Sequence, residues 1–233
     1  MLTPVERILF VLAALISLIL TAIAARRIVR TISRGQGRPE LGQLGHRVAD
    51  AVVKFVTFSP TFLVRRWTSV FHALVGWGFT FYLLVNLIDV TEAFLPGYAF
   101  LEGATLGDLF RLGADIFSVF VLVGMAYLIA RRFIVRPSSL SVRSTTLLHP
   151  KARLGIRRDS AIVAGFIVLH VGARFFGQSY LLALDGPDAW QPSASTLAGV
   201  WAGWNEASLV VALHVCFWFA LGLILAFLPY FLY

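Results

Sequence analysis

The chain alternates between long apolar runs and shorter polar connections. A helix needs roughly 20 apolar residues to cross the hydrocarbon core of a bilayer. Runs of about this length occupy residues 5–25, 69–90, 113–130, 160–180 and 207–233. The pattern therefore predicts an all-α fold: an integral membrane bundle of five transmembrane helices, forming one domain over residues 1–233.

The composition supports a membrane protein. Of the 233 residues, 58% are hydrophobic and 14% are charged, whereas soluble domains are about half apolar and about a quarter charged. The first run lacks a small-residue cleavage site after a short apolar stretch, so we expect it to remain as a span. The single cysteine, Cys216, excludes an internal disulfide and an iron–sulfur cluster held only by thiolates of this chain.

Charge is distributed unevenly between the connections. Arginine and lysine gather in residues 26–66 and 131–158, whereas the other two connections are mainly acidic, with Asp89, Glu92, Glu102, Asp108, Asp185, Asp188 and Glu206. Because cytoplasmic loops carry the excess of basic residues, this pattern predicts an outside N-terminus and a cytoplasmic C-terminus in the cell inner (plasma) membrane. This topology explains the net charge of +8, so the expected partner of the basic loops is the lipid bilayer and not nucleic acid.

Three of the connections carry structural signals. Leu44, Val48 and Val52 lie at helical spacing within residues 41–63, which predicts an amphipathic helix on the inner surface, as an interface helix or as a docking site. Glycine and proline interrupt residues 92–107, and residues 184–204 contain turn signals and tryptophans. We expect the latter segment to form a cap on the outer face.

Three histidines, His72, His170 and His214, lie inside three different apolar runs. An imidazole in hydrocarbon is costly unless its ring nitrogens are occupied by a hydrogen-bond partner, a proton path or a metal. Neutral imidazole is a common axial ligand of haem iron. Three such residues favour haem, and a haem with two histidine ligands has no open site and carries electrons.

The depth of each histidine follows from the helical rise of about 1.5 Å per residue. His170 lies roughly 16 Å and His214 roughly 18 Å from the cytoplasmic boundary, so we expect this pair to hold one haem in the outer half. His72 lies roughly 9 Å from that boundary. A second haem there would need a ligand at or just past Tyr233.

Polar residues near the outer ends of the spans suggest further roles. Arg174 is four residues after His170 and is expected either to bind a haem propionate or to extend toward the surface and pair with Asp185 or a lipid head group. A quinol needs a hydrogen-bonding group and a proton acceptor. We assign these roles to Asn86, Asp89 and Gln178, although Asp89 equally fits a residue that ends a helix at the interface.

Several segments resemble known cytochromes. The cytochrome b (gamma) subunit of respiratory nitrate reductases has a second span similar to SVFHALVGWGFTFYLLVNLIDVTEAFLPG and a fifth span similar to VALHVCFWFALGLILAFLPYF. The chain more closely resembles the N-terminal membrane domain of heterodisulfide-reductase-like iron–sulfur oxidoreductases, in RGQGRPEL, LLHPKARLGIRRDS and VLHVGARFFGQS. The resemblance covers essentially the whole chain.

This resemblance implies a five-helix membrane domain with two haems b and a quinone site near the outer haem. His72 and His214 match family ligands, whereas another family ligand falls close to Tyr82, so His170 is expected to replace it. In the second group the chain continues with a further histidine and a cytoplasmic iron–sulfur domain, which implies a truncation after Tyr233.

The expected function is therefore that of a membrane b-type cytochrome. It would pass electrons between menaquinone or another quinone and a cytoplasmic iron–sulfur domain or subunit, through one or two haems b. Substrate reduction is expected on that other domain or subunit. A proton or solute transporter with a histidine relay is disfavoured because mid-membrane acids and inverted repeats are absent from the sequence. A cofactor-free membrane anchor would leave the three histidines without a role.

Overall fold

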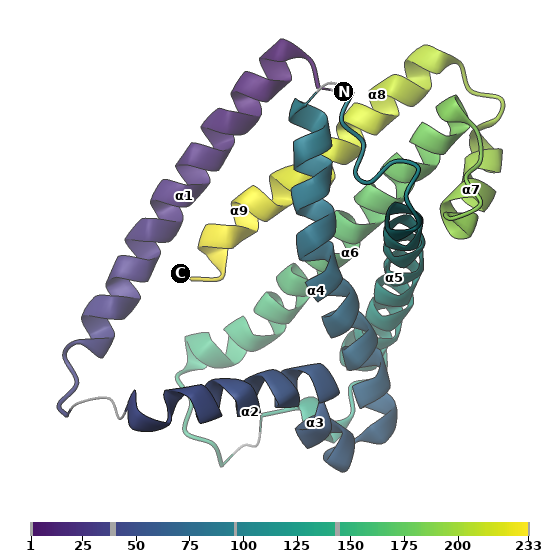
Figure 1. Ribbon diagram of the computed structural model, residues 1–233. Coiled ribbons are helices and arrows are strands. Elements are labelled where there is room, and N and C mark those ends of the chain that lie inside the picture. Colours follow the sequence, from purple (N-terminus) through teal and green to yellow (C-terminus); the bar gives the residue numbers. More distant parts are fainter. Residues whose placement is uncertain (1, 38–40, 96, 143–144, 233) are drawn as a thin grey trace.

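The computed structural model describes residues 2–37, 41–95, 97–142 and 145–232, and over these residues the protein contains helices and no strands (Figure 1). Five helical segments are long and apolar enough to cross a membrane, which confirms the predicted number of spans. Their bounds are Pro4–Ile32, Arg66–Phe94, Thr105–Val135, Pro150–Asp185 and Glu206–Tyr230. They correspond to α1, α4, α5 with its π-helical end η2 (Ala130–Val135), α6, and α8 (Glu206–Phe217) continued by η5 (Trp218–Gly222) and α9 (Leu223–Tyr230).

Four of the five helices extend beyond both ends of the apolar runs that predicted them, whereas the last ends at Tyr230. The largest difference is in α6, which begins at Pro150 rather than near Ser160. The imidazole of His149 caps this helix by accepting a hydrogen bond from Lys151 N. An apolar run marks only the part of a helix that suits hydrocarbon, whereas polar residues continue the backbone hydrogen bonding into water.

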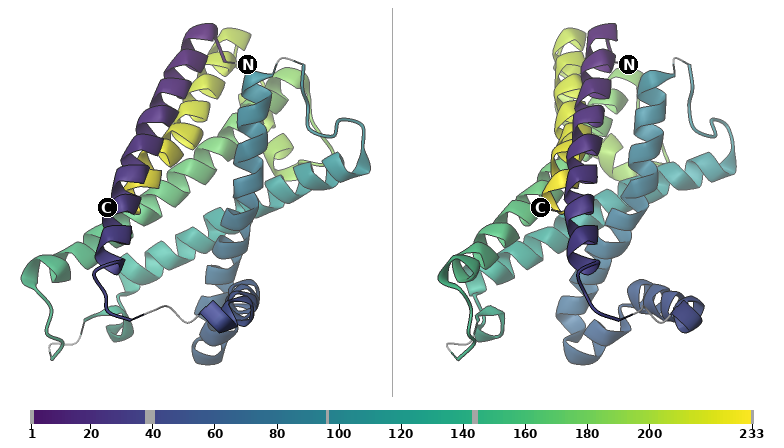
Figure 2. Two further views of the ribbon diagram at one scale, coloured as in Figure 1. Left: turned by 60° about the vertical axis from the view of Figure 1, so that its left-hand side comes forward. Right: turned by 90° about the vertical axis from the view of Figure 1, so that its left-hand side faces the viewer.

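The spans form two groups, which meet where α6 packs against the last span. Helices α4, α5 and α6 pack around a core that includes Tyr82, Val85, Val121 and Met125. Tyr82 and Ser118 join α4 to α5 by a buried hydrogen bond of 2.5 Å. The first span, α1, runs beside α8 and α9, as both views in Figure 2 show. We call the end of the bundle that carries Asp185 the acidic end, and the end that carries Arg132 and Arg157 the basic end.

Close packing of α4 on α5 requires a residue without a side chain at Gly78. A Cβ added there would overlap the side chain of Val121, which is fully buried and has no free space to move into. We expect Gly78→Ala to lower the free energy of unfolding by about 1–3 kcal/mol, because overpacking displaces buried neighbours. Thermal unfolding in detergent measures this loss.

Gly165→Ala on α6 is the matched control, since a Cβ there would meet nothing within 4 Å. Equal unfolding temperatures for the two variants would contradict the close α4–α5 contact.

The predicted amphipathic helix forms, but it is divided in two. Its parts are α2 (Leu44–Thr57), which runs crosswise to the spans at the basic end (Figure 1), and α3 (Ser59–Val64). The break falls at Phe58, whose φ of 50° is left-handed. Pro60 explains it, because a proline has no N–H to continue the helical ladder and its ring clashes with the carbonyl four residues earlier. That carbonyl, of Val56, instead accepts a hydrogen bond of 2.8 Å from Trp77 Nε1 on α4.

The expected cap at the acidic end contains the short helix α7 (Pro192–Ala198) and the turn η4 (Gly199–Trp201). Two carboxylates attach it to the spans. The buried Asp115 on α5 accepts hydrogen bonds of 2.9 Å from Ser193 N and Ala194 N at the start of α7. Asp188, in the loop after α6, accepts from Arg111 Nε on α5 at 2.8 Å.

Asp188 makes the attachment of this cap sensitive to pH. Burial raises the pKa of its carboxyl, but hydrogen bonds from Gln191, Trp190 N and Arg111 outweigh burial and hold the pKa below its ordinary value. A carboxyl with a lowered pKa in the folded state stabilises that state above its unfolded pKa, and the stabilisation is lost as pH falls through the folded pKa. We therefore expect hydrogen exchange in residues 188–201 to be slow at neutral pH and to accelerate below about pH 4, relative to the intrinsic rate. In Asp188→Asn this acid-induced step should disappear; an unchanged step would assign it to another group.

Candidate functional site

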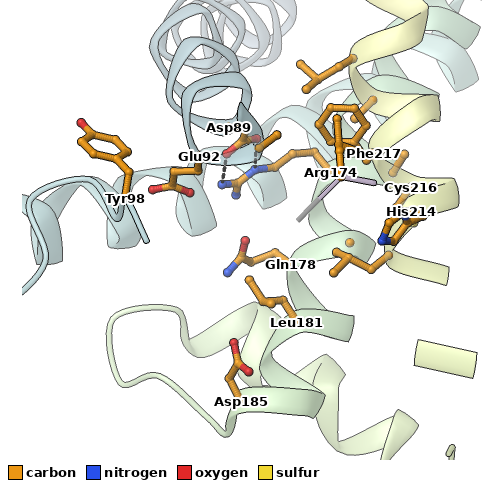
Figure 3. A pocket seen from close by; sticks show the side chains of 17 residues that line it. Asp89, Glu92, Tyr98, Arg174, Gln178, Leu181, Asp185, His214, Cys216 and Phe217 are labelled. Atoms are coloured by element: carbon orange, nitrogen blue, oxygen red, sulfur yellow. Dashed lines mark hydrogen bonds and ion pairs between the residues drawn. The ribbon is translucent and has the colours of Figure 1, made fainter. Parts of the chain in front are cut away.

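A cavity of about 430 Å³ opens between α4, α6 and α8 at the acidic end (Figure 3). Asp89 and Glu92 lie on its α4 side, Arg174 and Gln178 extend into it from α6, and His214 lies on its α8 side. Apolar side chains, including Leu181, Leu213, Phe217 and Leu221, form much of the remaining wall. This combination of an apolar wall with a few convergent polar groups is typical of small-molecule sites.

The strongest polar contact in the cavity joins α4 to α6. The guanidinium of Arg174 binds both carboxylate oxygens of Asp89, from Nε at 3.1 Å and from Nη2 at 3.2 Å. The Arg174 side chain is only 11% exposed, so its charge is balanced by Asp89 and not by solvent. The structure pairs Arg174 with Asp89 and not with Asp185, because Asp89 on α4 binds two of the three guanidinium nitrogens, Nε and Nη2. Asp89 is thus the partner of a buried cation, and not merely a residue at a helix end.

His214 is positioned by the first span. Its Nδ1 donates a hydrogen bond of 2.8 Å to Glu6 of α1. Trp218, one turn after His214, donates to the same carboxylate through Nε1 at 3.2 Å. Glu6 also accepts from the backbone N and the hydroxyl of Thr3, forming the capping box that begins α1.

His170 lies deeper and does not line the cavity, although Ala173 and Arg174 beside it do. Its side chain is 0% exposed, and its Nδ1 donates to the carbonyl oxygen of Ala220 at 2.7 Å. Ala220 belongs to the π-helical turn η5, and such turns are frequent at functional sites. On its other side, Nε2 of His170 lies 3.4 Å from Nδ2 of Asn86 on α4.

Asn86 is only partly satisfied. Its Nδ2 faces His170, but its Oδ1 is buried and has no hydrogen-bond partner among the described residues. A buried carbonyl oxygen without a donor is uncommon in proteins. The Oδ1 atom of Asn86 could therefore accept one more hydrogen bond, from a donor that the described residues do not supply.

His72 stands apart from the other two histidines. It is exposed on α4 toward the basic end, and its Nδ1 donates to the carbonyl oxygen of Thr68 at 3.0 Å. The ligand expected at or just past Tyr233 lies outside the described residues. The structure thus brings Asp89, Arg174, Gln178 and His214 to one cavity, places Asn86 beside His170, and leaves His72 separate.

The three histidines share one feature of their hydrogen bonding. In each, Nδ1 faces an oxygen that accepts: the Thr68 carbonyl, the Ala220 carbonyl and the Glu6 carboxylate. A neutral imidazole with its proton on Nδ1 presents the lone pair of Nε2. His149 has the opposite arrangement, because its Nδ1 accepts from Lys151 N.

Glu6 is the functional residue that the sequence reasoning missed. Two signals were present: the spacing of Thr3 and Glu6, which is that of a capping box, and the position of an acid near the start of an apolar run. Neither signal indicates which helix the carboxylate faces.

Comparison of the chain with protein-family models, with curated proteins and with solved structures finds no match. The functional argument therefore depends on the chain's own residues.

Proposed function

We propose that this protein is a membrane-bound b-type cytochrome that passes electrons between a quinone and an iron–sulfur partner. The observation that carries the proposal is that Nδ1 of His72, His170 and His214 each lies within hydrogen-bond distance of a carbonyl or carboxylate oxygen. Histidines that bind metals usually donate their other ring N–H to a carbonyl or carboxylate, which fixes the tautomer and the ring orientation. Three histidines in three apolar spans have this arrangement.

The donor chemistry of these residues fits a haem. A bound haem b would supply one-electron redox chemistry at an iron held between two imidazoles. His170 and His214 are the proposed ligands of one haem, with Ala220 O and Glu6 holding their rings, and His72 is the proposed ligand of a second. Asn86 would have to leave Nε2 of His170 for that nitrogen to bind iron, and its Oδ1 already lacks a partner.

The cavity at the acidic end is the proposed quinone site. Its volume of about 430 Å³ is typical of pockets for small organic molecules. Gln178 supplies an amide for a quinone carbonyl, and Asn86 remains a candidate for the same role deeper in the bundle. Asp89 would accept a quinol proton only when its pair with Arg174 opens. While Asp89 holds the guanidinium, Arg174 can bind a haem propionate only with the nitrogens that Asp89 leaves free.

The proposed topology follows the charge of the two ends. The acidic end, with the quinone site, faces outward together with the N-terminus, and the basic end faces the cytoplasm of a cell with an inner (plasma) membrane. A cytoplasmic iron–sulfur domain or subunit would then exchange electrons with the haem served by His72. The quinone is menaquinone or a relative of it.

A reduced-minus-oxidised absorption spectrum of the purified protein, with a pyridine haemochrome assay, tests the proposal. We expect a b-type signal that His170→Ala and His214→Ala each reduce by the content of one haem, because bis-histidine ligation needs both rings. His149→Ala is the control, since its imidazole caps α6 at the basic end. Absence of any haem signal would favour a cofactor-free anchor, and full haem content in both ligand variants would show that His170 and His214 do not hold a haem.

A further inference from the structure

A second cavity, of about 280 Å³, lies at the basic end of the bundle, and neither His170 nor His214 lines it. It forms where the π-helical end of α5, η2, is followed by the turn η3 (Ser138–Leu140) and where α6 begins. Four arginines line it: Arg132 and Arg136 from η2 and its end, and Arg153 and Arg157 from the first turns of α6. We refer to it as the arginine cavity.

Among the described residues, no carboxylate lines the arginine cavity. Its arginines contact backbone carbonyls and one aromatic ring: Arg132 donates to Leu140 O at 2.9 Å, Arg136 to Phe133 O at 2.6 Å and Arg153 to Thr146 O at 3.0 Å, while the Arg157 guanidinium lies 5.8 Å from the Phe133 ring centre. A guanidinium has five N–H donors, so most donors of this cluster have no protein acceptor among the described residues.

The nearest acid along α6 is engaged elsewhere. Asp159 faces Arg158 at 3.8 Å and accepts a hydrogen bond from the Tyr230 hydroxyl at 3.4 Å. Arg136, Arg153 and Arg157 are exposed and Arg132 is half-buried, so solvent screens their mutual repulsion, while an anion bound between them would be attracted by all four charges. The arginine cavity is therefore a site of uncompensated positive charge within the part of the chain that the structure describes.

The rest of the lining indicates what kind of anion fits. Pro137, Leu140, Val142 and Ile156 give the cavity an apolar side, and Ser141 adds a hydroxyl. Guanidinium groups bind phosphate oxygens through two parallel hydrogen bonds. Basic pockets between the cytoplasmic ends of transmembrane helices bind phospholipid head groups, whose phosphate is attached to apolar chains.

We propose that the arginine cavity binds a phosphate group, supplied by the head group of an anionic phospholipid. Arg132 and Arg153 hold the phosphate oxygens, and the apolar side receives the first part of the acyl chains. Free inorganic phosphate is the other source of the same chemistry. The site is independent of the haem and quinone assignments.

The test uses the full chain in nanodiscs of phosphatidylcholine with a small fraction of phosphatidylglycerol, and native mass spectrometry to count retained lipid. The cavity variant is Arg132→Gln/Arg153→Gln. The matched control is Arg30→Gln/Arg34→Gln, which removes the same charge at the basic end from residues outside the cavity. Arg132 and Arg153 would each make a charge-assisted hydrogen bond to the phosphate, so the cavity variant should bind phosphatidylglycerol about 100-fold more weakly. The control loses only the general attraction of surface charge and should weaken binding much less.

Retention of phosphatidylglycerol by the unmodified chain and the control, with loss in the cavity variant, would support the proposal. Equal weakening in both variants would overturn it, because net charge alone would then explain binding. Titration of the detergent-solubilised chain with inorganic phosphate separates the sources: if phosphate binds to the cavity and phosphatidylglycerol does not displace it, the lipid assignment is wrong. Circular dichroism of the cavity variant distinguishes lost binding from lost folding.

Discussion

Replacing Asp89 with alanine is expected to lower the free energy of unfolding of the bundle by about 3–5 kcal/mol. The substitution removes the carboxylate that binds Arg174 through two hydrogen bonds. Arg174 then keeps its charge, at 11% side-chain exposure, without the carboxylate that is hydrogen-bonded to it. Removing one member of a buried ion pair is far more costly than the pair itself is stabilising, because the remaining ion has lost its hydration.

Thermal unfolding in detergent measures this loss, and a double variant isolates its cause. Asp89→Ala/Arg174→Met removes both charges and should recover most of the stability, since an apolar replacement of a buried pair is often neutral. Asp185→Ala is the control, because that acid lines the same cavity and makes no ion pair among the described residues. If the double variant were less stable than Asp89→Ala, the uncompensated charge would not be the cause.

Glu6→Ala is expected to have the second largest effect, lowering the free energy of unfolding by about 2–4 kcal/mol. The substitution removes the capping box at Thr3 and leaves the donors of His214 and Trp218 without their common acceptor. The loss should be concentrated in α1, because Glu6 is its polar link to α8. If the haem proposal holds, the substitution should also weaken haem binding by about 10–100-fold, as loss of the partner of a ligating histidine does.

Hydrogen exchange along α1, together with thermal unfolding, measures the effect of Glu6. Glu6→Gln provides the graded comparison, because its amide keeps one acceptor oxygen for His214. Its unfolding temperature and the protection of α1 should lie between those of Glu6→Ala and the unmodified chain. Glu102→Ala, an exposed acid in the loop before α5, should change neither measurement. Normal protection of α1 in Glu6→Ala would mean that the apolar contacts of Phe10 with Phe217 and Trp218 suffice to hold the helix.

The spans were predictable because a transmembrane helix satisfies its own backbone. Each apolar run must form internal hydrogen bonds wherever it lies, so its length and composition alone predict a spanning helix. The ends were less predictable, since a helix such as α6 continues through polar residues from Pro150. The break at Phe58 could have been predicted from the sequence, because Pro60 follows it.

The depth of the histidines was also available from the sequence, but their partners were not. Helical rise converts residue number into depth, so His170 and His214 could be placed at similar levels. The helical rise does not indicate how each helix is rotated about its own axis, and this rotation decides which neighbour a side chain faces. His214 faces Glu6 on α1 and His170 faces Ala220 and Asn86, and these directions depend on how four separate spans pack.

The sequence by itself determined that this protein is a bundle of five membrane-compatible helices, with charge of opposite sign gathered at its two ends. It also determined that three histidines lie within those helices. Only the tertiary structure decided that Arg174 pairs with Asp89, that Glu6 holds His214 and that four arginines surround one cavity. The physical reason is that a helix forms through contacts within one segment, whereas a buried polar side chain is satisfied by whichever helix the packing brings opposite it.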